Sequence, residues 1–127
     1  MNNRLQPSIS ELRYLAVWQV ELQKSYLQLL VLASLAESPK HMAQLSYHLA
    51  QLTDNVILPR QVSLYRGLKR WEVSGLIKFD LTPSPAGPAY KEYHLTVAGD
   101  RILKAFIERN GSVLIGKKIE KLLRDVS

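Results

Sequence analysis

Apolar and polar residues follow two different periods along this chain, and these periods separate helical segments from a hairpin. Up to residue 73, apolar residues recur every three or four positions, which is typical of amphipathic helices. Between residues 76 and 95 the period falls to two, which is typical of strands. We predict helices over residues 9–22, 25–37, 41–52, 60–73, 97–109 and 112–125, and strands over residues 76–81 and 90–95.

Capping and breaking residues support these boundaries. Ser8 and Glu11 form a capping-box pattern at the start of the first helix, and Thr96 stands before the helix that follows the strands. Gly75 closes the helix that ends at residue 73. The proline-rich segment at residues 82–88 cannot be helical, and we expect it to be the loop that joins the two strands.

The order of the elements is typical of one fold class. Three helices followed by a two-stranded hairpin predict a mainly α protein with a small β-hairpin, a winged helix-turn-helix with dimerisation helices at both ends. We expect a winged-helix domain over residues 25–104, an N-terminal extension helix within residues 1–24 and a C-terminal helical segment over residues 105–127. Both end segments are expected to serve dimerisation.

The helix over residues 61–73 is the candidate for DNA recognition. On a helical wheel its apolar face comprises Leu64, Leu68 and Trp71, and the opposite side carries Val62, Ser63, Arg66, Lys69, Arg70 and Val73. Gln61, Tyr65 and Glu72 lie on a flank, and Arg60 adds a cation at the helix start. Arg and Lys hold phosphates, and Arg and Gln also pair with base edges in the major groove. The alternative is an ordinary solvated face, although such a face usually mixes in acidic residues.

Composition and charge narrow the function. The chain has 127 residues, a net charge of +6 and no cysteine, so disulfides, a thiol nucleophile and cysteine zinc sites are excluded. A basic domain of this size suggests a polyanionic partner such as double-stranded DNA. Neither a membrane-spanning run nor the pattern of a secretory signal is found, and we expect a cytoplasmic protein.

Two motifs resemble the PadR family of transcriptional regulators. The run Ser63–Ile77 resembles the family's recognition helix and its Gly-Leu-Ile entry into the wing, and the run Tyr90–Gly99 resembles its second wing strand. With the segment from Leu30 to His41, the resemblance spans about residues 27–103. It implies a dimeric winged-helix repressor in which Ser63, Tyr65 and the wing residue Lys91 contact DNA.

The sequence departs from the family pattern at informative places. Val62 replaces the glycine that usually precedes Ser-Leu-Tyr, and the wing tip has few cations. The part after the wing is short, so we expect the N-terminal helix to share in dimerisation. Trp18 either packs within a helix pair, which we favour, or stacks a small aromatic effector as an aromatic residue does in some PadR-like regulators.

No pattern of catalysis is present, so we expect neither an enzyme nor a cofactor. His41 and His48 lack a third ligand at suitable spacing, so no metal site is expected. The sequence predicts a sequence-specific DNA-binding regulator, with DNA contacts from Arg60, Gln61, Ser63, Tyr65, Arg66, Lys69, Arg70 and Lys91. The alternative is a protein-interaction module that retains the winged-helix fold without specific DNA binding.

Overall fold

The longest element is helix α1, Ile9–Glu37, in the computed structural model, which describes residues 6–127. The Ser8 hydroxyl accepts a hydrogen bond from the Glu11 N–H, and the Glu11 carboxylate accepts one from the Ser8 N–H, so the predicted capping box is confirmed. The prediction of two separate helices here is wrong. Residues 23–25 are Gln, Lys and Ser, which contain no helix breaker, so the helix continues across the expected boundary between residues 24 and 25.

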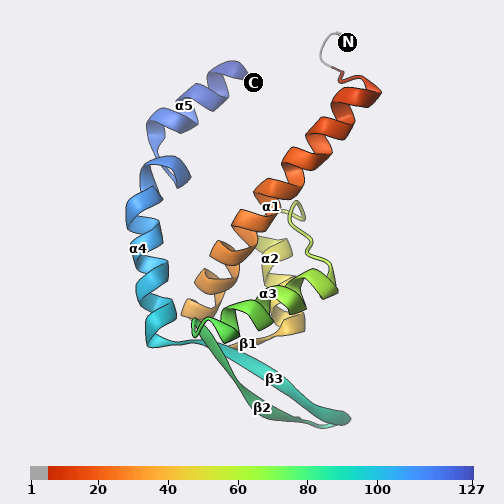
Figure 1. Cartoon of the computed structure of the whole chain (residues 1–127), viewed down its shortest axis with the longest axis vertical. Helices are drawn as coiled ribbons and strands as arrows, with labels where there is room; N and C mark the ends of the chain where they lie inside the picture. The colour runs from red at the N-terminus through yellow and green to blue at the C-terminus, as the bar shows by residue number, and fades with distance from the viewer. Residues whose placement is uncertain (1–5) are drawn as a thin grey trace.

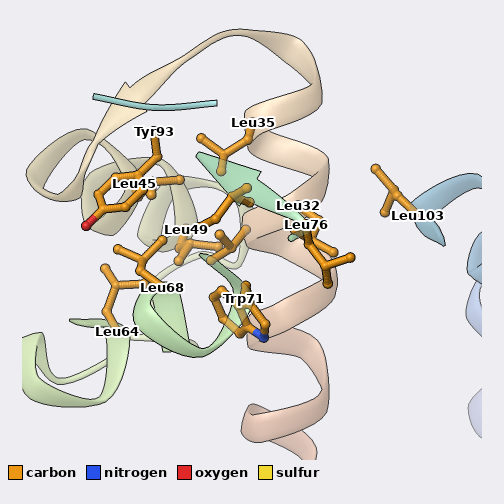
Figure 2. Close-up of a cluster of buried hydrophobic side chains, with 12 residues drawn as sticks. Leu32, Leu35, Leu45, Leu49, Leu64, Leu68, Trp71, Leu76, Tyr93 and Leu103 are labelled. Carbon is orange, nitrogen blue, oxygen red and sulfur yellow. The ribbon is translucent and has the colours of Figure 1, made fainter. Parts of the chain in front are cut away.

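Helix α2, Met42–Leu52, packs against the C-terminal half of α1, and helix α3, Gln61–Val73, packs against α2 (Figure 1). His41 caps α2, and its Nδ1 accepts a hydrogen bond from the Gln44 N–H at 3.3 Å. Apolar side chains from all three helices meet in one core with residues at the base of the wing (Figure 2). The buried members are Val31, Leu32, Leu35, Leu45, Leu49, Leu64, Leu68, Trp71, Leu76, Ile77, Tyr93 and Leu103.

The wing is formed by strands β2, Ile77–Ser84, and β3, Gly87–Leu95. With the two-residue strand β1, Lys40–His41, they form an antiparallel sheet in the order β1-β3-β2. The hairpin extends away from the helices (Figure 1) and leaves α3 at the surface, which confirms the predicted winged-helix fold. Strand β1 was not predicted, because two residues are too few to show the alternation of apolar and polar positions that is typical of a strand.

The expectation that residues 82–88 form a loop is correct only for the turn at its centre. Both strands run into this segment, and only residues 85 and 86 lie between them. Pro83 is tolerated because β2 is an edge strand, and the register shifts between Thr82 and Ser84. The wing is therefore longer than the sequence pattern indicated.

Two further helices, α4 (Val97–Leu114) and α5 (Lys117–Val126), follow the wing. The expected break at Asn110 and Gly111 is wrong, because α4 passes through both residues. The chain turns instead at Ile115 and Gly116. A Cβ atom on Gly116 would lie 2.0 Å from the Ser112 carbonyl oxygen, so this turn brings the chain too close to α4 for a larger residue.

The predicted capping role of Thr96 is confirmed, and its side chain also joins α4 to the turn between α3 and β2. Its hydroxyl accepts a hydrogen bond from the Gly99 N–H at 3.0 Å and lies 2.7 Å from the Gly75 carbonyl, to which it donates. We expect Thr96→Ala to lower the free energy of unfolding by about 1–2 kcal/mol, because the α4 cap and this link are both lost. Denaturant unfolding checks the value, and Thr96→Ser, which keeps the hydroxyl, is the control.

Candidate nucleic-acid interface

Helix α3 has a buried face and an outward face, as its sequence predicts. Leu64, Leu68 and Trp71 are buried in the core, and Gly67 lies beside them, where a Cβ atom would be 2.7 Å from the Trp71 ring. Gly75 has a φ of +80° at the end of the helix and turns the chain into the wing. The core therefore fixes which side of α3 faces outward.

The outward line of α3 consists of Val62, Arg66, Lys69 and Val73, which follow one another at helical spacing and are all exposed. Neither Arg66 nor Lys69 takes part in an ion pair among the described residues. Unpaired cations on an exposed helix face keep their full charge available for a polyanion. This is the arrangement that phosphate binding requires.

The side of α3 nearest α1 carries Arg60 and Ser63, which were expected among the DNA contacts. Together with Lys24 of α1 they line a hollow of about 430 Å³ between α1 and the loop that precedes α3. Arg60 occupies the N-cap position but makes no capping hydrogen bond through its side chain. Lys24 was not among the predicted site residues, because its position on a helix gives no sign that it lies near the start of α3.

The other flank of α3 faces the wing. Burial raises the pKa of the Tyr93 phenol above its ordinary value, and the nearby Glu72 carboxylate and Tyr65 phenol of α3 raise it further. Tyr65 is itself exposed, as is Gln61. Tyr65 therefore lies near the junction of α3 and the wing.

Lys91 of the wing lies on the strand face that is turned toward the helices. Its Nζ atom is 4.4 Å from the centre of the Phe79 ring of β2, a cation–π contact that holds the side chain against the neighbouring strand. Arg70 of α3 makes a similar contact, with its guanidinium carbon 5.7 Å from the Trp71 ring centre. Residues 82–89 at the wing tip include no charged residue. The cations of this surface are thus concentrated on α3 and the wing base rather than at the tip.

A second exposed surface lies on the long helices at the ends of the chain. Leu15, Trp18 and Leu22 form one seam along α1, and Trp18 is 64% exposed. Toward the C-terminal end of α1 the same seam continues as Leu29 and Leu32, which line a hollow of about 240 Å³ with α4. Beyond this contact α1 and α4 diverge (Figure 1), so the N-terminal half of the seam is left uncovered by this chain.

Helix α5 is also amphipathic and without a partner among the described residues. None of its side chains is buried, although Ile119, Leu122, Leu123 and Val126 form an apolar stripe. The opposite side carries two ion pairs within the helix, Lys121 with Asp125 and Arg124 with Glu120.

None of the described helices has the length and apolarity to cross a membrane. Within residues 6–127, no three His, Asp or Glu side chains gather as a metal site requires.

Comparison with known proteins identifies the class to which this architecture belongs. Residues 31–105 match the family model of the PadR-like transcriptional regulators. The chain belongs to this family. The match begins in the C-terminal part of α1 and ends within α4, so it contains the whole wing and α3 and confirms the resemblance expected from the sequence. A PadR-like protein is a transcriptional regulator rather than an enzyme.

Solved structures of PadR-like regulators resemble the chain over most of their length. The PadR family transcriptional regulator of Eggerthella lenta is 27% identical, with a TM-score of 0.67, and the alignment covers 91% of this chain and 97% of that one. The PadR-like transcriptional regulator of Bacillus cereus is 25% identical, with a TM-score of 0.67 and coverage of 81% and 96%. A transcriptional regulator of Clostridium thermocellum, 23% identical, shares the fold with a TM-score of 0.67 and coverage of 80% and 93%. No curated protein matches the chain.

Proposed function

We propose that this PadR-like regulator binds a specific double-stranded DNA site as a homodimer and represses transcription from it. The observation that carries the proposal is the outward line of α3, where Arg66 and Lys69 are exposed and free of ion pairs. A recognition helix enters the major groove, and cations on its surface hold the phosphates on either side.

The remaining candidate residues have roles that follow from their places around α3. Arg60 and Ser63 contact the backbone at the α1 side of the helix, and Gln61 and Tyr65 reach base edges or phosphates at the wing side. Arg70 and Lys91 are held by aromatic rings, and they supply charge around the groove without needing to enter it. Because the wing tip carries no cation, most of the phosphate contacts come from α3.

The dimer is supported by the uncovered seam of α1 and the bare apolar stripe of α5. Leu15, Trp18 and Leu22 continue a surface that α4 already covers at its other end, and a second copy would extend the same packing. The N-terminal part of α1 and the C-terminal helical segment therefore form the dimer interface. Residues 25–104 form the DNA-binding domain. Two copies related by a two-fold axis place two α3 helices in successive major grooves, about 34 Å apart.

Trp18 lies in the middle of this interface. Two roles were considered for it from the sequence: packing within a helix pair and stacking of a small aromatic effector. We favour packing against a helix of the second copy, because Trp18 belongs to the same seam as Leu15 and Leu22. A small flat aromatic effector that stacks on the exposed indole would compete with this packing and change the spacing of the two α3 helices. Quenching of tryptophan fluorescence in Trp71→Phe protein by such compounds tests this role.

The DNA-binding proposal is tested by fluorescence anisotropy with duplex DNA from upstream of the chain's own gene. We expect Arg66→Ala and Lys69→Ala each to weaken binding by about tenfold at moderate salt, because each removes one phosphate contact per subunit. The slope of log affinity against log salt should fall by about 2 for the dimer, at roughly 0.9 per contact.

Arg101→Ala is the matched control, since it removes one exposed cation from α4 and leaves α3 unchanged. Equal losses in all three variants would show a general charge effect instead of a contact by α3. Absence of binding below about micromolar concentration, with no salt dependence, would contradict the proposal.

The alternative is a protein-interaction module that has kept the winged fold. Two features favour it. Val62 stands where a glycine would permit a closer approach of the backbone to phosphate, and the wing tip is uncharged, whereas a wing that contacts the phosphate backbone usually does so through cations. A partner protein recovered with the wild-type chain and equally with Arg66→Ala would support this alternative, whereas loss of DNA binding in Arg66→Ala supports the first.

A further inference from the structure

Val62 is an apolar residue in the first turn of α3, at the head of its cationic outward line. Its side chain is 59% exposed, and it is followed on the same line by Arg66 and Lys69. It is absent from the buried core and from the partly buried residues that pack against it. A β-branched residue also has a lower helix propensity than lysine, arginine or glutamate. Packing within the chain therefore gives no reason for an apolar side chain at this position.

The first turn of a recognition helix is where base edges are read. In helix-turn-helix complexes the helix lies in the major groove with its N-terminal residues against the bases. The bases present hydrogen-bonding groups there, and thymine alone adds an apolar group, its C5-methyl. An exposed isopropyl group matches that methyl and cannot pair with the polar groups of the other bases.

We propose that Val62 recognises thymine by packing against its C5-methyl group in each half-site. This inference rests on the proposed DNA-binding function and adds a specificity-determining residue to it. Arg66 and Lys69, one and two turns further along the same line, hold the helix in the groove by charge. Val62 supplies discrimination between bases without contributing to the electrostatic attraction.

The experiment begins with selection of binding sites from random duplex DNA by the full-length chain. Each thymine of the selected site is then replaced by deoxyuridine, which differs only by the absence of the C5-methyl group. At one position in each half-site, we expect replacement of that single thymine to weaken wild-type binding about three- to fivefold, the value of one buried methyl group. Val62→Ala should bind the thymine and uracil duplexes equally and keep the wild-type salt slope, because no charge is removed.

Val73→Ala is the matched control, because Val73 is also apolar, lies on the same line at the other end of α3 and is 78% exposed. We expect this variant to retain the wild-type preference for thymine over uracil. Circular dichroism establishes that both variants are folded. Val62→Thr provides a second measurement: threonine keeps the shape of the side chain but replaces one methyl group by a hydroxyl, so we expect a reduced preference for thymine over uracil.

Failure of this inference differs from failure of DNA binding itself. If selection enriches no site, specific DNA binding is contradicted and thymine recognition falls with it. If a site is enriched but the wild-type chain binds every uracil duplex as tightly as the thymine duplex, thymine recognition alone is overturned. It is also overturned if Val62→Ala keeps the full preference for thymine.

Discussion

We expect the double variant Leu15→Asp with Leu22→Asp to be a monomer and to bind its DNA site at least about a hundredfold more weakly than the wild type. Both residues lie on the uncovered seam of α1 and are exposed in the single chain, so aspartate costs the monomer little. In the dimer the same carboxylates would be buried in an apolar interface, which is strongly unfavourable without partners. A monomer also loses the linkage between two half-sites, which is commonly worth 10²–10⁴ in affinity.

Sedimentation or light scattering gives the oligomeric state, and anisotropy gives the affinity for the intact site and for a single half-site. The variant should bind a single half-site as well as the wild-type subunit does, since α3 is unchanged. Val17→Asp serves as the control because Val17 is similarly exposed on α1 but points away from the seam. A double variant that stays dimeric would show that the seam is not the interface, and a monomer with full affinity would show that pairing is not needed for binding.

The identity and order of the main elements were predictable because helix and strand periods are local properties of the sequence. The two faces of α3 followed from helical geometry alone, and the structure buries Leu64 and Leu68 as the wheel predicts. The boundaries were less predictable. Asn110 and Gly111 resemble a helix end, yet nothing lies within 4 Å of the Cβ position of Gly111 and α4 continues through it. The helix ends instead just before Gly116, where the chain passes close to the Ser112 carbonyl oxygen. This close approach cannot be recognised from the local composition.

The candidate interface shows the same division between local and tertiary information. The outward positions of Arg66 and Lys69 follow from the helix itself. The hollow that joins Ser63 to Lys24 depends on how α1 crosses the start of α3, and the position of Lys91 over Phe79 depends on the pairing of β2 with β3. Sequence periodicity predicts which side of a single helix or strand is buried. Which residues of two different elements lie together can be known only from how those elements pack.

Gly99→Ala is the substitution that we expect to destabilise the fold most. Gly99 is buried in the first turn of α4, and a Cβ atom there would lie 2.1 Å from the Leu76 carbonyl oxygen and 2.9 Å from the Leu95 side chain. The Leu76 carbonyl also accepts a hydrogen bond from the Thr96 N–H at 3.0 Å, so it is part of the base of the wing and cannot move freely. We expect the free energy of unfolding to fall by at least about 3 kcal/mol, at the upper end of overpacking effects. Denaturant unfolding at one fixed protein concentration measures it, since the stability of a dimer depends on concentration.

Gly111→Ala distinguishes this contact from a general effect of alanine in α4. The Cβ position of Gly111 is open, and alanine is favoured over glycine in a helix interior by about 1 kcal/mol, so this variant should be as stable as the wild type or more stable. Similar stabilities for the two variants would contradict the close approach of α4 to the base of the wing. The contact also links the two proposed surfaces, because α4 borders the α1 seam while Leu76 lies between α3 and the first wing strand. A shift of α4 against Leu76 would therefore move the dimer helices relative to the recognition helix, so even folded Gly99→Ala protein should bind its two half-sites with altered spacing.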